Sequence, residues 1–461
     1  MANIRDQCSW VHMHEPEEAT RKSRDLVRMA VAKARLIEPL YSEPIPIKSG
    51  VLVIGGGIGG MTAALNLADQ GFAVHLIERE KELGGNLRHV HYLLDVDDVQ
   101  GKLKEIIRKA NDHPNIEVLT GTRIEAVDGF VGNFTTKVRQ DGKEAEIEHG
   151  VVIVATGAKE HTPSEYMYGS DERIVTQREL EEKLAKAEFN AKRVVMIQCV
   201  GSREGDRMYC SRICCSQAVK NALKIKEDYQ DTDVFILYRE LRTYGFREQY
   251  FTMARQKGIR FVRYEVDQKP TVSAEGERLR IYTKDPVLES TLQIDCDLLV
   301  LAPAIVPQDD AGDVAQMLKV PLTKEKFFLE AHMKLRPVDF SVDGVFLAGM
   351  AHSPKNVDET IIQAKAAASR ASTIISRSDY TPEAIISSVD EDVCAGCGIC
   401  VSVCNYDAPE IITIRGKRIS RINRALCKGC GACTSACPSG AVQQLGFRAK
   451  QLSEMVSAAL E

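Results

Sequence analysis

Two features are missing from this sequence of 461 residues: a long apolar run and an excess of basic charge. No apolar run approaches the roughly 20 residues of a membrane-spanning helix, and no basic n-region with an apolar h-region opens the chain. The formal net charge is −5, which gives nucleic acid or an anionic membrane no electrostatic reason to bind. We therefore expect a cytoplasmic protein with no membrane span and no nucleic-acid partner.

Cysteine, in contrast, is abundant and clustered. Of the 14 cysteines, all but Cys8 and Cys296 fall within residues 199–215 and 394–437. A reducing cytosol disfavours disulfides, so metal binding is the better default for clustered cysteines. With 44% hydrophobic residues, the chain can bury a full core and should divide into two or three domains.

Residues 51–78, VLVIGGGIGGMTAALNLADQGFAVHLIE, have the pattern of a dinucleotide-binding βαβ unit. A short apolar strand leads into Gly55, Gly57 and Gly60 at G-x-G-x-x-G spacing, and a helix and a second strand follow, ending at Glu78. Glycines let the backbone and the helix N-terminus approach a pyrophosphate, and the acid accepts hydrogen bonds from ribose hydroxyls. This order predicts a dinucleotide site rather than a plain structural βαβ unit.

Three further segments favour FAD over NAD: ELGGNL at 82–87, VVIVATGA at 151–158 and GVFLAGMA at 344–351. Together with the glycine motif they resemble the FAD domain of the thioredoxin-reductase and glutathione-reductase group of flavoproteins. Met350 stands where that group usually has an acidic residue for the ribityl contact. The candidate FAD-binding residues are Gly55, Gly57, Gly59, Gly60, Glu78, Arg79, Gly84, Gly85, Asn86, Ala155, Thr156, Gly157, Gly349 and Met350.

That group carries an inserted NAD(P)H domain, and an insert with the same strand–helix–strand order is present here. Its turn, QCVGSREG, retains only Gly201 and Gly205, which are not at fingerprint spacing. The nicotinamide phosphate loop is therefore lost, and a C-x10-C-x3-C-C pattern stands in its place. The pattern favours an unusual 4Fe–4S site, with buried structural thiols or zinc as alternatives. The candidate ligands are Cys199, Cys210, Cys214 and Cys215.

The spacing within this stretch predicts local structure as well. Cys210 and Cys214 are one helical turn apart, so on a helix they would face the same way. Adjacent Cys214 and Cys215 could reach different corners of a cluster only where the backbone is irregular. A regular helix is expected from about Ser216.

Two runs near the C-terminus, CAGCGICVSVC from 394 and CKGCGACTSACP from 427, have the bacterial ferredoxin spacing C-x2-C-x2-C-x3-C. In that arrangement three cysteines hold one cluster and the fourth crosses to the other. Proline follows Cys437, whereas Asn405 follows Cys404. We assign one 4Fe–4S cluster to Cys394, Cys397, Cys400 and Cys437, and a second to Cys427, Cys430, Cys433 and Cys404.

Nearly the whole chain resembles the A subunit of heterodisulfide reductase, the FAD and iron–sulfur component of that enzyme in anaerobic archaea and some anaerobic bacteria. The resemblance rests on NIRDQCSWVH, VLVIGGGIGG, ELGGNLR, QCVGSR, YCSRICCSQAVK and the ferredoxin pair. It implies a non-standard 4Fe–4S cluster at 199–215, near the flavin. It also implies that Lys220 lies close enough to the isoalloxazine to influence its reduced states; a solvated helix lysine is the alternative.

Family members usually carry an N-terminal domain with its own cluster, and NIRDQCSWVH resembles only the end of that domain. Cys8 is then either a free thiol in a packing arm or a ligand to a fourth cluster shared with a separate partner chain.

We expect an α/β protein: a thioredoxin-reductase-like two-domain FAD flavoprotein with a C-terminal α+β two-cluster ferredoxin domain. Its last helix is a docking helix or a plain terminal helix. The expected parts are an N-terminal arm and helix (1–48), a discontinuous FAD-binding domain (49–165 and 296–380), the cluster-carrying insert (166–295), the ferredoxin domain (386–446) and a C-terminal helix (447–461).

The resemblance implies flavin-based electron bifurcation. The electron-transfer component of a hydrogenase or formate dehydrogenase would deliver electron pairs to the FAD. These would pass to ferredoxin and, through the B and C subunits of the reductase, to a disulfide of the coenzyme M–coenzyme B type. A homodimer of the complex is a further family expectation. The alternatives are an NAD(P)H-dependent flavoprotein with ferredoxin domains and an electron-wire scaffold without bifurcation.

Overall fold

The computed structural model describes residues 1–42, 44–276 and 278–460, which divide into two compact units. One unit combines residues 1–47 with 378–461, and the other spans 48–377. Positions 43, 277 and 461, within the expected arm, insert and last helix, lie outside the described residues. Across the described ranges, no helix has the length and apolarity required to cross a membrane.

A five-stranded parallel sheet forms the centre of the part of the 48–377 unit that lies outside the insert. Strands such as VLVI and VVIV are apolar at every position and buried on both faces, as expected for parallel strands covered on both sides. In spatial order the strands are β19 (Val345–Leu347), β8 (Val151–Val154), β2 (Val51–Ile54), β3 (Val74–Ile77) and β4 (Ile116–Leu119).

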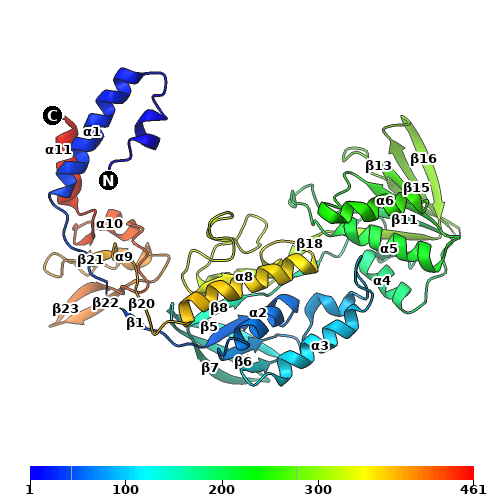
Figure 1. Cartoon of the computed structure of the whole chain (residues 1–461), viewed down its shortest axis with the longest axis horizontal. Helices are drawn as coiled ribbons and strands as arrows, with labels where there is room; N and C mark the ends of the chain where they lie inside the picture. Colours follow the sequence, from blue (N-terminus) through cyan, green and yellow to red (C-terminus); the bar gives the residue numbers. More distant parts are fainter. Residues whose placement is uncertain (43, 277, 461) are drawn as a thin grey trace. The chain divides into compact units, whose positions relative to one another are not determined.

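Helices α2 (Ile58–Ala68) and α8 (Val357–Ile375) pack against each other, as Figure 1 shows, and α3 (Val99–Asp112) packs against α2. Small buried residues allow the close approach of α2 and α8. They are Gly59, Gly60, Ala63 and Ala64 on α2, and Ala364, Ala367, Ala368 and Ala371 on α8.

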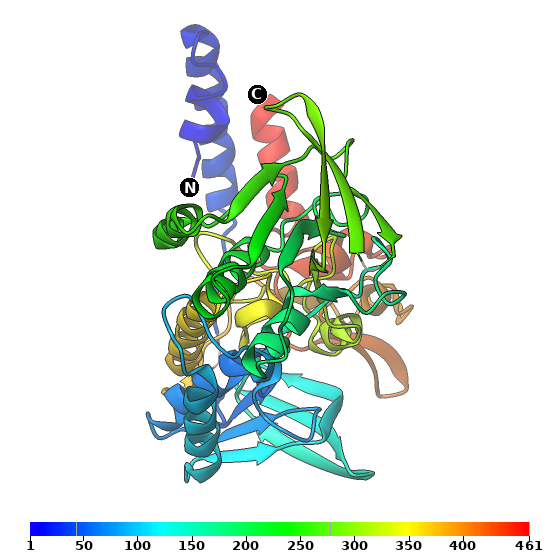
Figure 2. The same cartoon turned by 90° about the vertical axis from the view of Figure 1, so that its right-hand side faces the viewer.

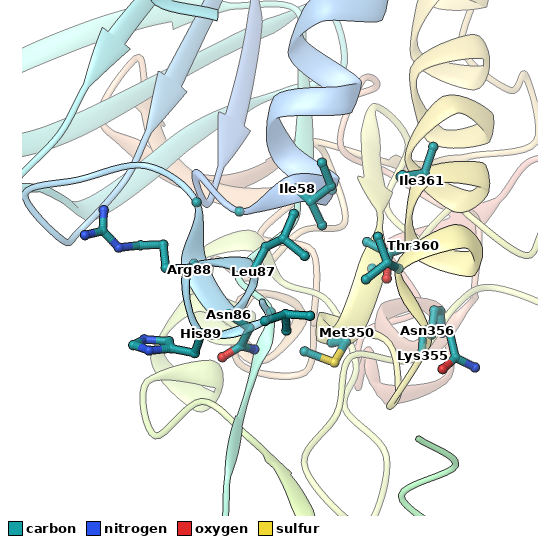
Figure 3. Close-up of a pocket in the computed structure, with 18 of the residues that line it drawn as sticks. Ile58, Asn86, Leu87, Arg88, His89, Met350, Lys355, Asn356, Thr360 and Ile361 are labelled. Atoms are coloured by element: carbon teal, nitrogen blue, oxygen red, sulfur yellow. The ribbon is translucent and has the colours of Figure 1, made fainter. Parts of the chain in front are cut away.

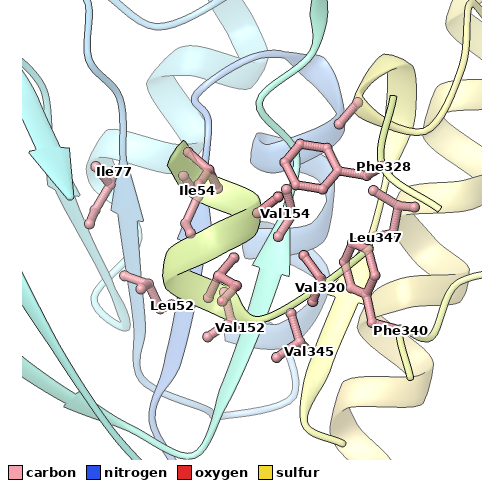
Figure 4. Close-up of a cluster of buried hydrophobic side chains, with 14 of the residues drawn as sticks. Leu52, Ile54, Ile77, Val152, Val154, Val320, Phe328, Phe340, Val345 and Leu347 are labelled. Carbon is pink, nitrogen blue, oxygen red and sulfur yellow. The ribbon is translucent and has the colours of Figure 1, made fainter. Parts of the chain in front are cut away.

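On the other side of this sheet, α7 (Ala311–Leu318) and aromatic side chains fill the core (Figure 4). Phe328 and Phe340 are fully buried and meet edge to face with ring centroids 6.0 Å apart. An antiparallel sheet of β5 (Thr122–Phe130), β6 (Asn133–Gln140) and β7 (Lys143–His149) contributes Phe134 and Val138 to the same cluster.

The insert is built on a second five-stranded parallel sheet. Its strands in spatial order are β10 (Ile174–Thr176), β17 (Leu298–Pro303), β11 (Arg193–Val200), β12 (Asp233–Tyr238) and β13 (Arg260–Arg263). Its helices are α4 (Gln177–Ala185), α5 (Cys214–Asp228), α6 (Glu248–Gln256) and the 3₁₀ turn η3 (Gly245–Arg247). An antiparallel sheet adds β14 (Thr271–Glu275), β15 (Arg278–Asp285) and β16 (Ser290–Cys296).

Two strands connect the insert to the rest of the unit, and they pair with each other. Strand β9 (Ala158–Glu160) leaves the first sheet and runs antiparallel to β18 (Ile305–Pro307), which returns. The short 3₁₀ helices η2 (Gly85–His89) and η4 (Gly349–Ala351) lie at the carboxyl ends of β3 and β19.

The second unit brings both ends of the chain together. Helix α1 (Pro16–Ala34) lies alongside α11 (Ala449–Leu460) in Figures 1 and 2. The Gln451 Nε2–H donates to the Leu36 carbonyl over 2.8 Å, and Arg448 pairs with Glu38. The last helix therefore docks on the chain's own first helix, and the N-terminal arm, with its π-helical turn η1 (Arg5–Ser9), belongs to the same unit as the cysteine repeat.

Short antiparallel strand pairs frame this cysteine repeat. The pairs are β1 (Ile45–Pro46) with β20 (Asp379–Tyr380), β21 (Ser387–Val389) with β24 (Val442–Gln444), and β22 (Pro409–Ile414) with β23 (Lys417–Ile422). The short helices α9 (Ile399–Ser402) and α10 (Ala432–Ala436) each follow a glycine-flanked cysteine turn, one in each half of the repeat.

Candidate functional site

A cavity of about 1240 Å³ opens at the carboxyl ends of the strands of the first sheet. This is where ligands bind in open α/β sheets. Figure 3 shows Ile58, Leu87 and Met350 projecting from three different segments toward this space. Most candidate FAD-binding residues line it: Gly57, Gly59, Glu78, Arg79, Gly84, Gly85, Asn86, Ala155, Thr156, Gly157, Gly349 and Met350.

Gly55 and Gly60 do not line the cavity but shape the turn beneath it. Gly55 has φ +112°, and a Cβ there would lie 2.3 Å from the Ala155 carbonyl oxygen. A Cβ on Gly60 would lie 1.8 Å from the Gly55 oxygen. At Gly57, by contrast, an added Cβ would meet no atom within 4 Å, because that position faces the open space. The three glycines thus bring a bare helix N-terminus to the cavity wall.

Glu78 lies at the end of β3 and is 8% exposed. Its Oε2 accepts from the Gly56 N–H over 2.6 Å and its Oε1 from the Glu80 N–H over 2.9 Å, which fixes the carboxylate at the cavity wall. Arg79 turns to Asp310, with its Nη1 3.1 Å from that carboxylate.

The remaining candidate FAD-binding residues differ in whether their polar groups already have a hydrogen-bond partner within the protein. The Asn86 Nδ2–H donates to the Ala158 carbonyl over 2.7 Å. The Gly349 N–H donates to Gln363 Oε1 over 2.9 Å, and Met350 follows at the wall. Buried Thr156 Oγ1 has no hydrogen-bond partner among the described residues, although it lines the cavity. A buried hydroxyl left in that state indicates a missing polar ligand.

The four cysteines at 199–215 gather at the carboxyl end of β11. Cys199, Cys214 and Cys215 are buried and Cys210 is partly exposed. Burial first, and then charge on the neighbouring cysteines, raise the pKa of the Cys199 thiol and that of Cys215, the latter to about 12. The four thiols are therefore close enough to interact electrically.

The backbone around these thiols differs from the local expectation. Cys210 lies outside the helix, because α5 begins only at Cys214, so the predicted helical-turn relation to Cys214 is wrong. Cys214 and Cys215 open a regular helix instead of an irregular segment. The irregularity lies upstream, where Cys199 and Arg212 have φ of +61° and +60°, the left-handed region that non-glycine residues rarely adopt.

Arginines surround this cysteine group. Charge on Arg203 and Arg239 acts on Cys199, and the pKa of Arg242 is raised by its hydrogen bond to Glu240 and by Cys210. The backbone N–H of Arg212 donates to Cys210 Sγ over 3.3 Å. Positive charge favours thiolates over thiols, which suits metal ligation.

Lys220 lies at the cavity wall, within a group of buried polar residues. Its Nζ donates to Glu181 Oε2 over 2.7 Å and to the Tyr92 carbonyl over 2.9 Å. Burial lowers the pKa of Lys220, while the Glu181 carboxylate raises it. Lys220 is thus not a solvated helix lysine. Since Lys220, Ser216 and Gln217 also line the cavity, one helix contacts both the cavity and the thiols.

The first half of the C-terminal cysteine repeat encloses a small pocket. Cys394, Cys397, Cys400 and Cys437 all line it, together with Ser420. The Ser420 N–H donates to Cys394 Sγ over 3.4 Å, and its hydroxyl lies 3.2 Å from Cys400 Sγ.

The second half mirrors these contacts with Ser387. Its N–H donates to Cys427 Sγ over 3.4 Å and its hydroxyl lies 3.3 Å from Cys433 Sγ. Burial raises the pKa of Cys433, and charge on Cys427, Cys404 and Cys430 raises it too, so Cys404 lies with the second set. Among the described residues, no three His, Cys, Asp or Glu side chains converge on a point suited to a single metal ion.

Two cysteines lie apart from these groups. Cys8 is 2% exposed, and its thiol donates to the Ala19 carbonyl of α1 over 2.8 Å. Cys296 is 1% exposed in the apolar core of the insert.

Sequence reasoning missed several residues of the site: Glu181, Tyr92, Ser420, Ser387 and Lys355. Glu181 and Tyr92 are distant from Lys220 along the chain, and no local pattern marks such a contact. The two serines precede or follow their cysteines by different distances, which hides their shared role. The pair His352 and Lys355, in HSPK directly after the glycine-ended strand, was the one available signal.

Family comparisons match both halves of this description. Residues 49–371 match the family described as pyridine nucleotide-disulphide oxidoreductase. Residues 387–444 match the family described as 4Fe-4S dicluster domain.

Curated relatives span most of the chain. The second iron–sulfur A subunit of CoB–CoM heterodisulfide reductase in Methanopyrus kandleri is 35% identical, covering 91% of this chain and 78% of its own. The A subunit of the H(2):CoB-CoM heterodisulfide,ferredoxin reductase of Methanothermobacter marburgensis is 34% identical, covering 89% and 76%. A protein of Archaeoglobus profundus described as like the heterodisulfide reductase A subunit is 32% identical, covering 88% and 78%.

Among solved structures, thioredoxin reductase of Lactococcus lactis aligns with a TM-score of 0.50 at 18% identity. The alignment covers 71% of this chain and 99% of that one. It supports the expected two-domain fold and says nothing of activity.

Proposed function

Because the chain belongs to the family of heterodisulfide reductase A subunits, and is therefore an oxidoreductase, we propose that it is the electron-distributing subunit of a heterodisulfide-reductase-like complex. It would take electron pairs from a partner hydrogenase or formate dehydrogenase. It would pass them to ferredoxin and to a disulfide acceptor on the partner B and C subunits.

The residues present fit an FAD. The bare N-terminus of α2 at Gly57 suits a pyrophosphate, and fixed Glu78 suits ribose hydroxyls. The unpartnered Thr156 hydroxyl is free to bind a polar group of the cofactor. When bound, FAD supplies the exchange between two-electron and one-electron chemistry. Met350 offers no charged group to the ribityl chain of FAD, so other residues of the cavity wall would have to bind that chain.

The observation that carries the proposal is the double role of α5. Its first turn provides Cys214 and Cys215, and the same helix presents Ser216, Gln217 and Lys220 to the cavity. A rise of about 1.5 Å per residue puts roughly 9 Å of helix between Cys214 and Lys220. Electrons exchanged between a cluster on these thiols and a cofactor in the cavity would travel a short path through this helix.

We propose three 4Fe–4S clusters within the chain. Cys199, Cys210, Cys214 and Cys215 would hold the first, in a group flanked by arginines. The two ferredoxin-type sets would hold the others, as the shared pocket of Cys394 and Cys437 supports. Cys8 could bind a cluster only if the hydrogen bond from its thiol to the Ala19 carbonyl were broken. A fourth cluster shared with a partner chain therefore has the weakest support.

Lys220 has a defined part in this proposal. Glu181 and the Tyr92 carbonyl hold its ammonium at the cavity wall, where it can respond to charge on the cofactor. Because Glu181 is completely buried, its carboxylate needs a balancing cation in contact with it, and this need keeps Lys220 in place.

Relatives supply the acceptors and donors that we propose. The Methanothermobacter marburgensis relative is named for an H(2):CoB-CoM heterodisulfide,ferredoxin reductase. A relative from Methanococcus maripaludis is named for an H(2)/formate:CoB-CoM heterodisulfide,ferredoxin reductase. Coupled delivery to ferredoxin and disulfide is the function we infer for this chain.

The purified complex tests that coupling. We expect it to reduce ferredoxin only when a disulfide acceptor is also present, because the downhill electron drives the uphill one. Equal ferredoxin reduction without the disulfide would reject coupling.

The NAD(P)H-dependent alternative meets an obstacle in the insert. A Cβ on Gly201 would lie 3.0 Å from the His161 ring and 3.3 Å from Arg207, so side chains fill the corner where a nucleotide phosphate would bind. Anaerobic addition of NADH or NADPH should leave the flavin spectrum unchanged, and rapid bleaching would favour this alternative. Near-zero FAD in gently purified protein with intact clusters would favour the electron-wire alternative.

A further inference from the structure

A chain of three titratable side chains ends at the wall of the cavity, and the function proposed above does not use it. His352 Nε2 lies 2.8 Å from Glu330 Oε2, and His352 Nδ1 lies 2.9 Å from Lys355 Nζ. The Lys355 side chain lies beside Asn356 in Figure 3, away from Ile58 at the start of α2, and it lines the cavity.

The direction of these hydrogen bonds is fixed by their ends. A carboxylate only accepts, so His352 Nε2–H donates to Glu330. This leaves a lone pair on Nδ1, which accepts from the Lys355 ammonium. Gln363 Nε2 also lies 3.1 Å from Nδ1, and its Oε1 accepts from the Gly349 N–H at the cavity wall. The histidine is thus held in one tautomer and one orientation.

Lys355 is a buried cation without a carboxylate in direct contact. It is 9% exposed, and its other close partner is the Ser353 hydroxyl, 2.7 Å from Nζ. In the described parts of the chain, none of the ion pairs involves this lysine. Such a charge is costly unless a ligand balances it, which is typical of functional sites.

The charged groups facing Lys355 come from three segments. Burial lowers the pKa of Lys355 to about 8; Arg212, which precedes α5, lowers it too, and Glu359 on α8 and Glu330 raise it. Burial also lowers the pKa of His352, so the imidazole is neutral near pH 7. Lys355 is therefore the only group of the three-residue chain that carries positive charge to the cavity.

We propose that Lys355 offers its ammonium to the part of bound FAD that becomes electron-rich, the isoalloxazine, and that His352 and Glu330 are positioning residues for it. The inference rests on the FAD site proposed above. The N-terminus of α2 would then face the negative pyrophosphate, and this lysine would face the negative charge that develops on the ring system.

Sulfite provides the first test, in the full chain loaded with FAD. Sulfite forms a bond to N5 of oxidised flavin, and the displaced electron pair leaves negative charge in the ring, which a nearby cation stabilises. Lys355→Met should weaken sulfite binding at least tenfold, and Lys355→Arg should restore most of it. Lys365→Met, at an exposed lysine on the following helix α8, is the control and should stay within twofold of the parent.

Trace acetylation of the chain, read by mass spectrometry, provides a test that needs no turnover. FAD should shield Lys355 from acetylation and leave Lys365 unaffected. In the flavin-free protein, Glu330→Gln should move the pH at which Lys355 becomes reactive to lower values, because it removes a carboxylate that favours the charged lysine. A purely structural Glu330 would leave that pH unchanged.

The outcomes separate the two proposals. If the parent chain binds no FAD, the cavity assignment itself fails. If the parent binds FAD but Lys355→Met binds sulfite as tightly as the parent, or Lys355 is acetylated equally with and without FAD, only the role of Lys355 is overturned.

Discussion

Lys220 and Glu181 form an ion pair whose side chains are 8% and 0% exposed. Removing one partner of a buried pair leaves an uncompensated charge and costs about 3–5 kcal/mol. Lys220→Met should therefore lower the free energy of unfolding of the flavin-free chain by about that amount, measured by urea denaturation followed by circular dichroism. The double variant Lys220→Met/Glu181→Gln should recover part of the loss; equal stability of the single variant and the parent would contradict the pair's importance.

His149 predicts a loss of stability in acid. It is completely buried, its Nδ1–H donates to the Val151 carbonyl over 3.1 Å, and Nε2 accepts from the Thr136 hydroxyl over 2.7 Å. Burial lowers the pKa of His149 to about 3, whereas an unfolded histidine titrates near 6.5. The unfolded state therefore binds the proton first, and stability should fall as pH drops from about 6.5 toward about 3.

Urea midpoints measured across that pH range check this expectation. His149→Gln keeps hydrogen-bonding groups but has no titrating proton, so its midpoint should depend less on pH than that of the parent. The same pH slope in both proteins would assign the acid sensitivity to other groups.

Residues that follow one another in a motif were predictable from sequence, and residues that meet through the fold were not. The glycines and the two ferredoxin runs follow from spacing, because the chemistry requires several groups within a few residues. Glu181 meets Lys220 only because α4 packs against α5. The Glu330–His352–Lys355 chain likewise depends on a long-range contact, between Glu330 and His352.

At the scale of elements, the turn from β2 to α2 sets the floor of the cavity. A Cβ on Gly60 would overlap the Gly55 carbonyl oxygen, so Gly60→Ala must displace the helix N-terminus. We expect FAD affinity to fall more than tenfold, measured from flavin retained on gel filtration. Gly312→Ala, on α7 where an added Cβ meets no atom within 4 Å, is the control and should bind FAD normally.

The paired halves of the cysteine repeat predict selective cluster loss. Cys437→Ser and Cys404→Ser should each remove one 4Fe–4S cluster, seen as lower iron content and simpler electron paramagnetic resonance spectra. Within the described residues, the cysteine contacts of Ser420 are with Cys394 and Cys400. Adding Ser420→Ala should thus shift the reduction potential of the cluster that survives in Cys404→Ser, and leave the one that survives in Cys437→Ser unchanged.

Helix starts were less predictable than helices. The sequence placed the start of the insert's helix near Ser216, but α5 begins at Cys214. Cysteine is a weak helix former, so propensity gave no reason to extend the helix backward. Arg212, with φ +60°, instead lies in the bend that precedes the helix, so both Cys214 and Cys215 fall in the first helical turn.

At the scale of the whole molecule, the two chain ends stabilise each other. Helix α1 has no fully buried residue of its own and packs mainly against α11. Removing residues 449–461 should therefore expose the α1 amides to hydrogen exchange while the 48–377 unit keeps its protection. Unchanged α1 protection would show that the helix is stable without its partner.

The division into two units was only partly visible in the sequence. The expected FAD-binding domain ends at residue 380, and the units meet in sequence at residues 377 and 378. That the first 47 residues join the C-terminal unit depends on contacts such as Gln451 with Leu36, which no local pattern predicts.

Helix α5 acts as a fixed spacer. Since Cys214, Cys215 and Lys220 share one rigid segment, their separation is set by bonded geometry and not by how two lobes dock. A rotation of the insert about the β9–β18 connection would change the distance from α5 to the flavin, but it would not change the distance between the two cysteines and Lys220. Any tuning of electron flow by motion would therefore show in the helix-to-cofactor distance alone.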